Sequence, residues 1–442
     1  MPILYCDNFR GFDKTFLTLR NVNFFVGENS TGKTSLLKLI GILSSEDFWR
    51  YGEFRTDDIS LGTFSDIITI PRGAKDYFDI AIADVGSGEK PFPFFIKLRF
   101  IDRDKQPLLK EMIYSTKNIT IQSSLEGRYL KYRFKILKST LVCSIDGFKS
   151  WIENAELSEI PFRRLETHYF GIIPTINLLM SEVIPSGSTK KSVTLSKTFR
   201  FQLPQFANNL AWIAPVRAKP QAHYRDEGPV YDSEGRHAPS VLKSILSPSV
   251  RKILNRFGYD SGLYDDIMTK DLVDLTQLAI RKIRRKKVKS DIFEIVVRIN
   301  GEERNIANVG YGISQILPIV VEAIARPDNT WFAAQQPEVH LHPKAQAALG
   351  DFIFKTQIVD SQKFIIETHS DYLIDRFRLR LSRSFHEKKP FPELGQVVFF
   401  SKKQHGNVVD IIELHADGSY PQEQPAAFRG FFIKEKLEII SI

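Results

Sequence analysis

The stretch Phe24-Phe25-Val26-Gly27-Glu28-Asn29-Ser30-Thr31-Gly32-Lys33-Thr34-Ser35 decides the fold of this chain. It matches the pattern G-x-x-x-x-G-K-[ST] at every fixed position, from Gly27 to Thr34. Apolar residues at 22–26 precede the loop, and a segment of helical character, 35–43, follows it. Glycines let such a loop turn its N–H groups inward, and the helix start adds positive potential, so the segment suits phosphate groups. A strand-to-helix turn that binds nothing is the alternative.

We therefore expect ATP to bind at this loop together with Mg²⁺. Lys33 is expected to reach the β- and γ-phosphates, and the Thr34 hydroxyl to hold the metal ion. The residues expected to contact the nucleotide are Gly27, Asn29, Ser30, Thr31, Gly32, Lys33, Thr34 and Ser35.

The composition is that of an ordinary globular protein, with 43% hydrophobic and 26% charged residues. The net charge of +9 favours a polyanionic partner only mildly, because such an excess also suits a solvated surface. Cys6 and Cys143 are too few for a disulfide framework, which predicts a reducing, cytoplasmic setting. The first residues lack the basic and apolar regions of a signal peptide, and no apolar window reaches 18 residues, so no membrane span is expected.

The rest of the chain shows three kinds of pattern. Apolar and basic residues alternate at 96–100 and 132–137, so residues 77–145 are expected to form antiparallel strands. An apolar stretch at 169–183 predicts a helix, and 239–289 reads as two helices. Asn300-Gly301 predicts a hairpin turn.

Three segments in the second half have to be considered beside the phosphate loop. Residues 308–315 contain Gly312-Ile313-Ser314-Gln315 and run into an apolar helix at 316–324; a plain helix cap would explain this segment equally well by itself. Residues 330–343 end in Gln335-Gln336-Pro337-Glu338-Val339-His340-Leu341-His342-Pro343. Residues 364–370 form a short apolar strand that ends in Thr368-His369-Ser370. A lone histidine at a strand end is usually structural, but the order of all three segments points to function.

This order resembles the ATP-binding-cassette ATPases of the SMC-like head type. It is similar to the branch that includes the overcoming-lysogenisation-defect nucleases and the PtuA subunits of Septu-type anti-phage systems. The resemblance assigns an opening strand and turn to residues 10–12. It assigns a strand that ends in Pro-x-Arg to residues 212–221 and Tyr224, and the signature motif to residues 310–315. Residues 337–343 correspond to the Walker B and D-loop region, and His369 to the switch histidine.

The resemblance implies an α/β fold, namely an ABC-type P-loop NTPase head. It would have a mixed or largely parallel core sheet, an antiparallel β lobe and a helical insertion. The expected domains are ATPase lobe I with the P-loop (1–75), an antiparallel β subdomain (76–150), a helical or insertion region (151–300), ATPase lobe II (301–395) and a C-terminal hairpin and tail (396–442).

The resemblance also implies an ATP site shared by two copies of the chain, in a homodimer or a higher oligomer. Ser314 and Gln315 of one protomer would close over the γ-phosphate held by the other, and ATP would act as a switch. The residues expected to take part in catalysis are Lys33, Gln335, Gln336, Glu338 and His369, and those expected at the metal are Thr34 and Gln335.

The main departure from the family pattern is a pair of amides. Relatives usually have an acid at the position of Gln335, and many have the general base at that of Gln336. An amide cannot deprotonate water and offers Mg²⁺ no negative charge, so we expect good ATP binding and poor hydrolysis. The chain is either a naturally slow ATPase or one whose acid has been exchanged to trap the ATP state. Glu338 and His369 remain candidates for positioning the attacking water.

After His369 we find neither Toprim carboxylates nor a His-Asn-His nuclease pattern, so we expect the effector to be a separate protein. Two functions are therefore expected. One is a sensor or scaffold of a bacterial anti-phage complex that controls a separate nuclease, possibly of the HNH type. The alternative is a RecF-like repair ATPase that clamps DNA. The basic run 281–289 could bind nucleic acid or be a solvated helix end. The apolar tail 426–442 could pack on its own head or dock the nuclease.

Overall fold

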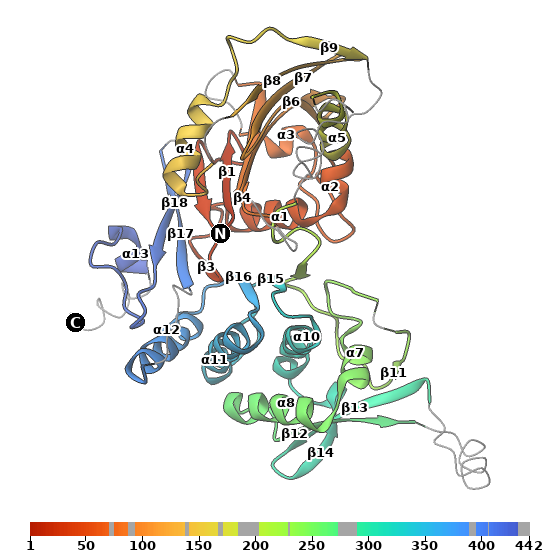
Figure 1. Ribbon diagram of the computed structural model, residues 1–442. Helices are drawn as coiled ribbons and strands as arrows, with labels where there is room; N and C mark the ends of the chain where they lie inside the picture. The colour runs from red at the N-terminus through yellow and green to blue at the C-terminus, as the bar shows by residue number, and fades with distance from the viewer. Residues whose placement is uncertain are drawn as a thin grey trace. The chain divides into compact units, whose positions relative to one another are not determined.

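The computed structural model describes residues 1–69, 75–86, 93–137, 141–166, 171–183, 203–228, 230–272, 290–388, 395–404 and 406–431. The chain divides into two compact units (Figure 1). The first unit comprises Met1–Arg20, Gly27–Leu210 and Val398–Ile411. The second comprises Asn21–Val26, Ala211–Val397 and Ile412–Ile442.

An eight-stranded antiparallel sheet dominates the first unit, in the order β2-β1-β4-β5-β6-β7-β8-β9. Its strands are β1 (Ile3–Asp7), β2 (Thr15–Thr18), β4 (Tyr77–Asp84), β5 (Phe94–Arg103), β6 (Gln106–Thr116), β7 (Ile119–Glu126), β8 (Tyr129–Ile136) and β9 (Arg163–Glu166). The helices of this unit are α1 (Lys33–Ser44), α2 (Glu46–Tyr51), α3 (Phe64–Ile67), α4 (Ile145–Asn154) and α5 (Ile172–Val183). The antiparallel lobe expected at 77–145 and the helix expected at 169–183 are therefore present.

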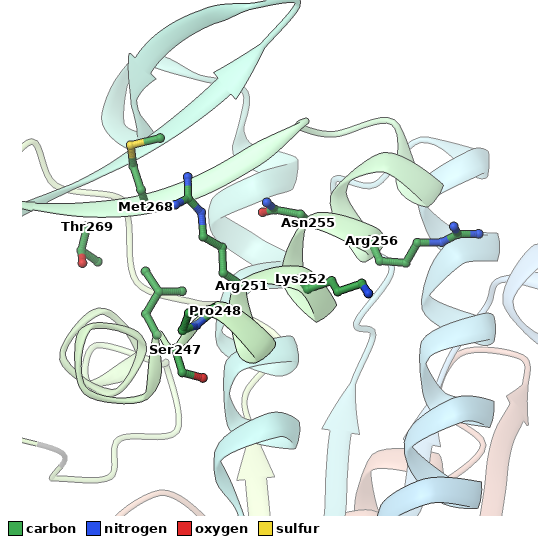
Figure 2. A pocket seen from close by; sticks show the side chains of 9 residues that line it. Ser247, Pro248, Arg251, Lys252, Asn255, Arg256, Met268 and Thr269 are labelled. Carbon is green, nitrogen blue, oxygen red and sulfur yellow. The ribbon is translucent and has the colours of Figure 1, made fainter.

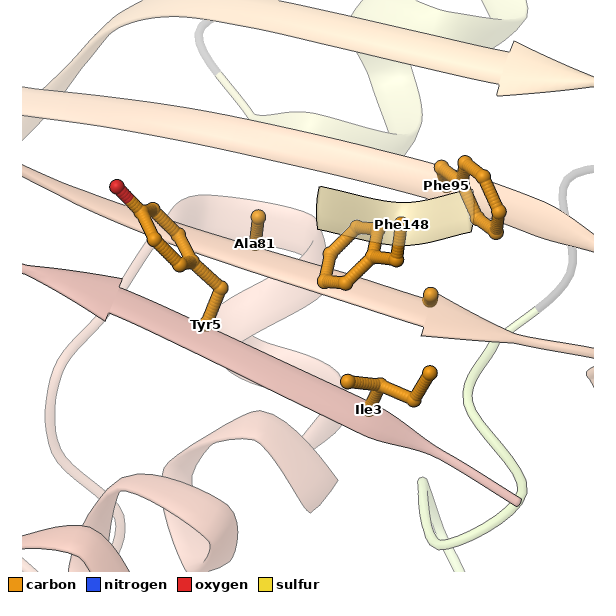
Figure 3. Packing of buried hydrophobic residues seen from close by; sticks show 6 residues of the cluster. Ile3, Tyr5, Ala81, Phe95 and Phe148 are labelled. Carbon is orange, nitrogen blue, oxygen red and sulfur yellow. The ribbon is translucent and has the colours of Figure 1, made fainter. Parts of the chain in front are cut away.

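Helix α4 covers one face of this sheet through Phe148, which is fully buried. Figure 3 shows its ring over the strands that carry Ile3, Tyr5, Ala81 and Phe95. The ring centroids of Phe148 and Phe95 lie 5.2 Å apart. The alternation in β5 is explained on the same sheet, because the basic side chains between its apolar ones form ion pairs with Asp79 of β4.

The alternation of apolar and basic residues at 132–137 predicts alternating burial, which strand β8 shows only in part. Arg133 is buried there, because its Nε donates to Gln122 Oε1 at 3.0 Å and its guanidinium lies over the Phe162 ring. Ile136, by contrast, is 67% exposed. Cross-strand partners therefore override the polarity pattern at this end of the strand.

A six-stranded sheet has the order β10-β15-β16-β3-β17-β18. Its strands are β10 (Leu210–Ile213), β15 (Trp331–Gln335), β16 (Lys363–Glu367), β3 (Val22–Gly27), β17 (Gly395–Lys403) and β18 (Gly406–Glu413). Strands β15, β16 and β3 run parallel. The P-loop strand, the strand that ends at Gln335 and the strand before His369 are thus parallel neighbours in one sheet, as expected.

Helices α10 (Tyr311–Ala325), α11 (Pro343–Asp360) and α12 (Asp371–His386) belong to the second unit (Figure 1). Helix α12 packs on β3 through Phe377 and Phe24, whose ring centroids are 5.3 Å apart, and on α11 through Phe377 and Phe354 at 5.7 Å. Helix α8 packs on α11 through Phe257 and Phe352.

The two helices expected over 239–289 are present but end at Ser261, and residues 273–289 of that range lie outside the described residues. The two helices are α7 (Ala238–Ile245) and α8 (Pro248–Ser261), and a strand, β12 (Asp266–Asp271), follows them. Strand β12 pairs with β13 (Ile292–Ile299), which also pairs with β11 (Tyr224–Arg225) and β14 (Glu302–Asn305). The Asn300-Gly301 turn joins β13 and β14 with positive φ at both residues, as expected for this hairpin. The 3₁₀ turn Ile306–Asn308 precedes α10.

The last described element is α13 (Ala426–Phe431). Phe428 is buried and its ring lies 5.2 Å from that of Tyr420, so this part of the tail packs on its own unit. The basic run 281–289, the polar segment 186–192 and residues 432–442 lie outside the described residues. Among the helices of the described part of the chain, none is both long and apolar enough to cross a membrane.

Candidate nucleotide-binding site

The loop between β3 and α1 lies in the first unit and can be formed only with glycine at two positions. Gly27 has φ +145, and a Cβ there would lie 2.1 Å from the Phe400 carbonyl oxygen. Gly32 has φ +92, and a Cβ there would lie 2.4 Å from Cζ of Phe12. Gly32 is also the N-cap of α1 and provides no side-chain cap, so the helix start is open to an anion. Residues 28–30 are exposed.

Lys33 places a cation inside this loop. Its side chain is only 4% exposed, and Nζ donates to the carbonyl oxygens of Gly27 at 2.8 Å and Glu28 at 2.6 Å. The Thr31 hydroxyl donates to the same Glu28 carbonyl at 2.7 Å. The ammonium group is thereby held at the centre of the loop, where a phosphate chain would be bound.

In the second unit, the parallel register aligns the ends of three strands. Gln335 pairs with Glu367, and Glu367 pairs with Phe25. The Thr368 N–H donates to the Phe25 carbonyl at 3.0 Å. Since the carboxyl ends of parallel strands are where α/β sheets bind ligands, this edge is the natural place for a site.

Gln335 and Glu367 form a buried pair at this edge. They are 7% and 5% exposed, and Gln335 Nε2 donates to Glu367 Oε2 at 3.2 Å. Gln335, at the position where the sequence resemblance expects an acid, is thus hydrogen-bonded to an acid on the neighbouring strand. Glu367 places a carboxylate beside the position where Gln335 lacks one.

The turn after β15 brings three of the expected catalytic residues together. Gln336 has φ +41, and its N–H donates to the Glu367 carbonyl at 2.7 Å. Glu338 is buried, and its Oε1 accepts the His369 N–H at 2.7 Å. Burial raises the pKa of Glu338 above its usual range, against the lowering effect of that hydrogen bond. His369 itself is exposed.

Arg217 is one of two residues near these strand ends, with Glu367, that the sequence did not assign to the site. Its Nη2 donates to the carbonyl oxygens of Gln335 and Gln336 at 3.4 and 3.5 Å. Its segment is held in place because the Ala214 and Ala218 N–H groups donate to Ser233 and Glu234. Arg217 is 3% exposed, and burial lowers its pKa to about 10.

Ser314 and Gln315, the residues expected to form the signature motif, lie in the first turns of α10 and do not form an exposed helix cap. Ser314 and Gln315 are buried, and the Ser314 hydroxyl donates to the Tyr311 carbonyl at 2.9 Å. The exposed residues at the helix start are Gly310 and Tyr311. The Tyr311 ring lies 6.1 Å from that of His340, so the signature helix and the Pro-Glu-x-His run meet within the second unit.

Each unit, taken by itself, contains oxygen donors of the kinds that Mg²⁺ prefers, namely carboxylate, hydroxyl and amide oxygens, which phosphates and water would supplement. The first unit offers the Thr34 hydroxyl, and the second offers the Gln335 side chain and the Glu367 carboxylate. Across the described ranges, no group of three or more His, Cys, Asp or Glu side chains forms a protein-only metal cage.

A wide cavity of about 800 Å³ lies elsewhere in the second unit, between α8 and β12. Figure 2 shows Arg251, Lys252 and Arg256 on α8, with Met268 on the strand. Arg251 and Arg256 are already engaged by Asp266 and Asp260. None of the expected site residues lines this cavity.

The expected site residues thus fall into three groups: the P-loop set in the first unit, the Gln335–His369 set in the second, and buried Ser314 and Gln315 on α10. Sequence reasoning did not assign Arg217 and Glu367. Arg217 is the arginine of the Pro-x-Arg segment, and Glu367 directly precedes Thr368-His369-Ser370. Both residues therefore lie in segments that the sequence had already singled out.

Strand, glycine loop, buried lysine and helix define the class: this is a P-loop nucleotide-binding protein of the α/β type. A family model described as an AAA ATPase domain matches residues 4–160 and 240–374, which is more than half of the chain. The chain belongs to this AAA ATPase domain family. A search of curated proteins found no significant match.

Three solved structures are similar to the chain at low identity. One is an SmcHead bound to the C-winged helix domain of ScpA, with 11% identity, 93% of this chain and 97% of that chain covered, and a TM-score of 0.41. The SMC head domain from Thermotoga maritima has 9% identity, coverage of 93% and 98%, and a TM-score of 0.39. The Smc head domain with an extended coiled coil from Pyrococcus furiosus, bound to the C-terminal domain of ScpA, has 11% identity, coverage of 99% and 100%, and a TM-score of 0.35.

Proposed function

We propose that this chain is an SMC-like ATPase subunit that binds Mg·ATP, pairs head to tail with a second copy when ATP is bound, and hydrolyses ATP slowly. We further propose that it acts as the sensor or scaffold of a bacterial anti-phage complex and controls a separate nuclease. The observation that carries the proposal is the P-loop, with Lys33 held at its centre and two glycines that its geometry requires. The family match supports the ATPase part.

Magnesium would shield the phosphate charges during transfer. Glu367 would supply the negative charge of the second unit's part of this site, because Gln335 has none to give. The Thr34 hydroxyl would contribute from the P-loop. Gln335 would then orient the Glu367 carboxylate through its amide.

Slow hydrolysis follows from the groups available to take a proton from water. Gln336, an amide, cannot act as a base. Glu338 can, but one of its oxygens is occupied by the His369 N–H and the group is buried. The exposed His369 side chain would serve to position the water rather than to deprotonate it. We expect a turnover number well below about 1 s⁻¹, the low end of ordinary enzymes.

The defence role rests on the sequence resemblance, and the reducing cytoplasm in which such a complex works suits the free Cys6 and Cys143. The test is co-purification at native expression, followed by a nuclease assay of the isolated complex. The proposal expects a nuclease subunit that is inhibited or released according to the nucleotide, and that is no longer controlled in a Lys33→Ala complex. A chain that purifies alone and whose deletion leaves phage plating unchanged would contradict it.

A further inference from the structure

Strand β12 is an edge strand whose outer backbone groups are only partly used. Among the strands that the structure describes, it is the last in its sheet, with β13 on one side. The Leu272 N–H donates to the Ile292 carbonyl, and bonded positions alternate along an antiparallel pair, so Ile267 and Thr269 direct their backbone groups away from β13. Asn255 of α8 accepts the Ile267 N–H at 3.1 Å. The N–H and C=O of Thr269 are left without a partner among the described residues.

This open edge borders the cavity between α8 and β12. Thr269 is one of the residues that line the cavity, whose volume of about 800 Å³ lies within the range of roughly 300–1,000 Å³ that is usual for ligand sites. Figure 2 shows Met268 and Thr269 on the strand, with Arg251 and Lys252 on the helix. Leu246, Pro248 and Met268 supply apolar surface. A chain laid along β12 would therefore find apolar groups beside the free backbone groups.

The charge of the cavity wall is positive. None of the described residues that line it carries a carboxylate, whereas three are cations, all on α8: Arg251, Lys252 and Arg256. Asp266 binds Arg251 but also lies 3.9 Å from Arg298, so one carboxylate faces two guanidinium groups. Arg256 is engaged by an acid of its own helix. Lys252 is exposed and has no acidic partner among the described residues. The wall thus retains positive charge for an acidic ligand.

We propose that this cavity docks an extended acidic segment of a partner protein, which adds as a strand to the edge of β12. Its backbone would pair with Thr269, its apolar side chains would cover Leu246 and Met268, and its acidic side chains would face Arg251 and Lys252. A nucleic acid strand could meet the cations but has no peptide backbone to extend the sheet. The cavity includes no residue of the nucleotide site, so the inference is independent of ATP binding.

The experiment measures peptide binding to the full chain by fluorescence anisotropy. The probe is a labelled pool of peptides about eight residues long, in which Val, Leu or Phe alternates with Glu or Asp. A second pool has Lys in place of the acids, and a third is the acidic pool with methylated backbone nitrogens. The acidic pool should bind at least about tenfold more tightly than either of the others, because one lacks the charge and the other lacks the donors.

Thr269→Pro tests the strand edge. It removes an N–H that takes no ladder bond, a position where edge strands accept proline, and should weaken the acidic pool by about tenfold. Thr269→Val, which keeps the N–H, is the matched control and should bind within about twofold of wild type. Lys252→Glu should weaken binding by about threefold or more at low salt and by less at high salt. Lys105→Glu, at an exposed turn of the first unit, should bind like wild type.

Three results would overturn the proposal. One is no binding of the acidic pool by wild type up to about 1 mM, including the case in which wild type self-associates through this edge instead. Another is equal binding of the methylated and unmethylated acidic pools, which also decides the matter if Thr269→Pro fails to fold. The third is a single-stranded DNA oligonucleotide that outcompetes the peptides and whose binding is lost in Lys252→Glu but kept in Thr269→Pro, which would make the cavity a nucleic-acid surface.

Discussion

At the scale of single residues, the hydrogen bond between Gln335 and Glu367 changes how the Gln335 side chain is interpreted. Seen in the sequence, Gln335 looks like the loss of a metal-site acid. In the structure it is hydrogen-bonded to an acid 32 positions away, on the adjacent parallel strand. The negative charge that Mg²⁺ needs is therefore available at the same strand edge.

We expect Glu367→Gln to weaken divalent-metal binding to the ATP complex by about tenfold or more, the loss seen when metal-site partners are removed. Metal-free nucleotide binding should change far less, since the P-loop provides it. Titration with Mn²⁺ followed by electron paramagnetic resonance measures both without relying on turnover. Glu302→Gln, at an exposed position, is the control. Equal Mn²⁺ affinity in Glu367→Gln and wild type would show that Glu367 is not the metal-site acid.

The P-loop could be predicted because its chemistry is local: eight consecutive residues carry the glycines, the lysine and the hydroxyl. Arg217 and Glu367 could not be assigned in this way. Arg217 acts on carbonyls 118 and 119 positions away, and Glu367 on a side chain 32 positions away. Such roles depend on sheet register and burial, which a single sequence does not specify.

At the scale of elements, α11 and α12 are joined by an ionic clamp. Asp351 of α11, whose side chain is 4% exposed, accepts from Arg376 at 2.9 and 3.0 Å and from Arg380 Nη2 at 2.8 Å. The helices approach so closely that a Cβ on Gly350 would lie 2.4 Å from the Leu373 carbonyl oxygen. The clamp thereby fixes the helix that follows His369.

We expect Asp351→Asn to lower the free energy of unfolding by about 2–4 kcal/mol at pH 7, because two arginines lose a buried partner. Burial would raise the pKa of Asp351, but Arg380 and Arg376 outweigh it and lower the pKa below its usual range. The folded pKa thus lies below the unfolded one, and the stabilisation is present above about pH 4 and lost as pH falls through the folded pKa.

Urea unfolding at pH 7 and pH 3 measures this effect. The difference between wild type and Asp351→Asn should shrink in acid. A difference that stays constant from pH 7 to pH 3, or that grows, would mean that the charge of Asp351 does not stabilise the clamp.

The parallel strands and flanking helices were predictable because their apolar runs and end signals are strong. Strand β12 was not, since Asp266–Asp271 contains only two apolar residues and begins shortly after α8 ends at Ser261. Its pairing with β13 determines its conformation, with Ile267 opposite Val297. Tertiary pairing therefore overrides a weak local pattern here.

At the scale of the whole molecule, the proposed dimer requires an exposed signature surface. Ser314 is buried and bonded to the Tyr311 carbonyl, so an arginine there would damage the protomer itself. Gly310 is better suited to a test, because a Cβ on it would meet no atom within 4 Å.

We expect Gly310→Arg to leave folding and ATP binding intact and to abolish ATP-dependent dimerisation, because it adds bulk and charge to the surface that must close. Light scattering with and without ATP measures it. Gly430→Arg, which also enters open space, should dimerise normally. A Gly310→Arg protein that dimerises like wild type would remove the signature helix from the interface.

The central claim is that the P-loop binds ATP, and calorimetry with Mg·ATP on wild type and Lys33→Ala tests it most directly. Lys33 is the first residue of α1 and donates to two carbonyls of the loop, and alanine is the best helix former, so Lys33→Ala should leave the chain folded. We predict one ATP per wild-type chain, with a Kd of about micromolar order, and a loss of at least about tenfold in Lys33→Ala. Wild-type protein that binds no ATP, or a folded Lys33→Ala protein that binds it equally well, would contradict the account.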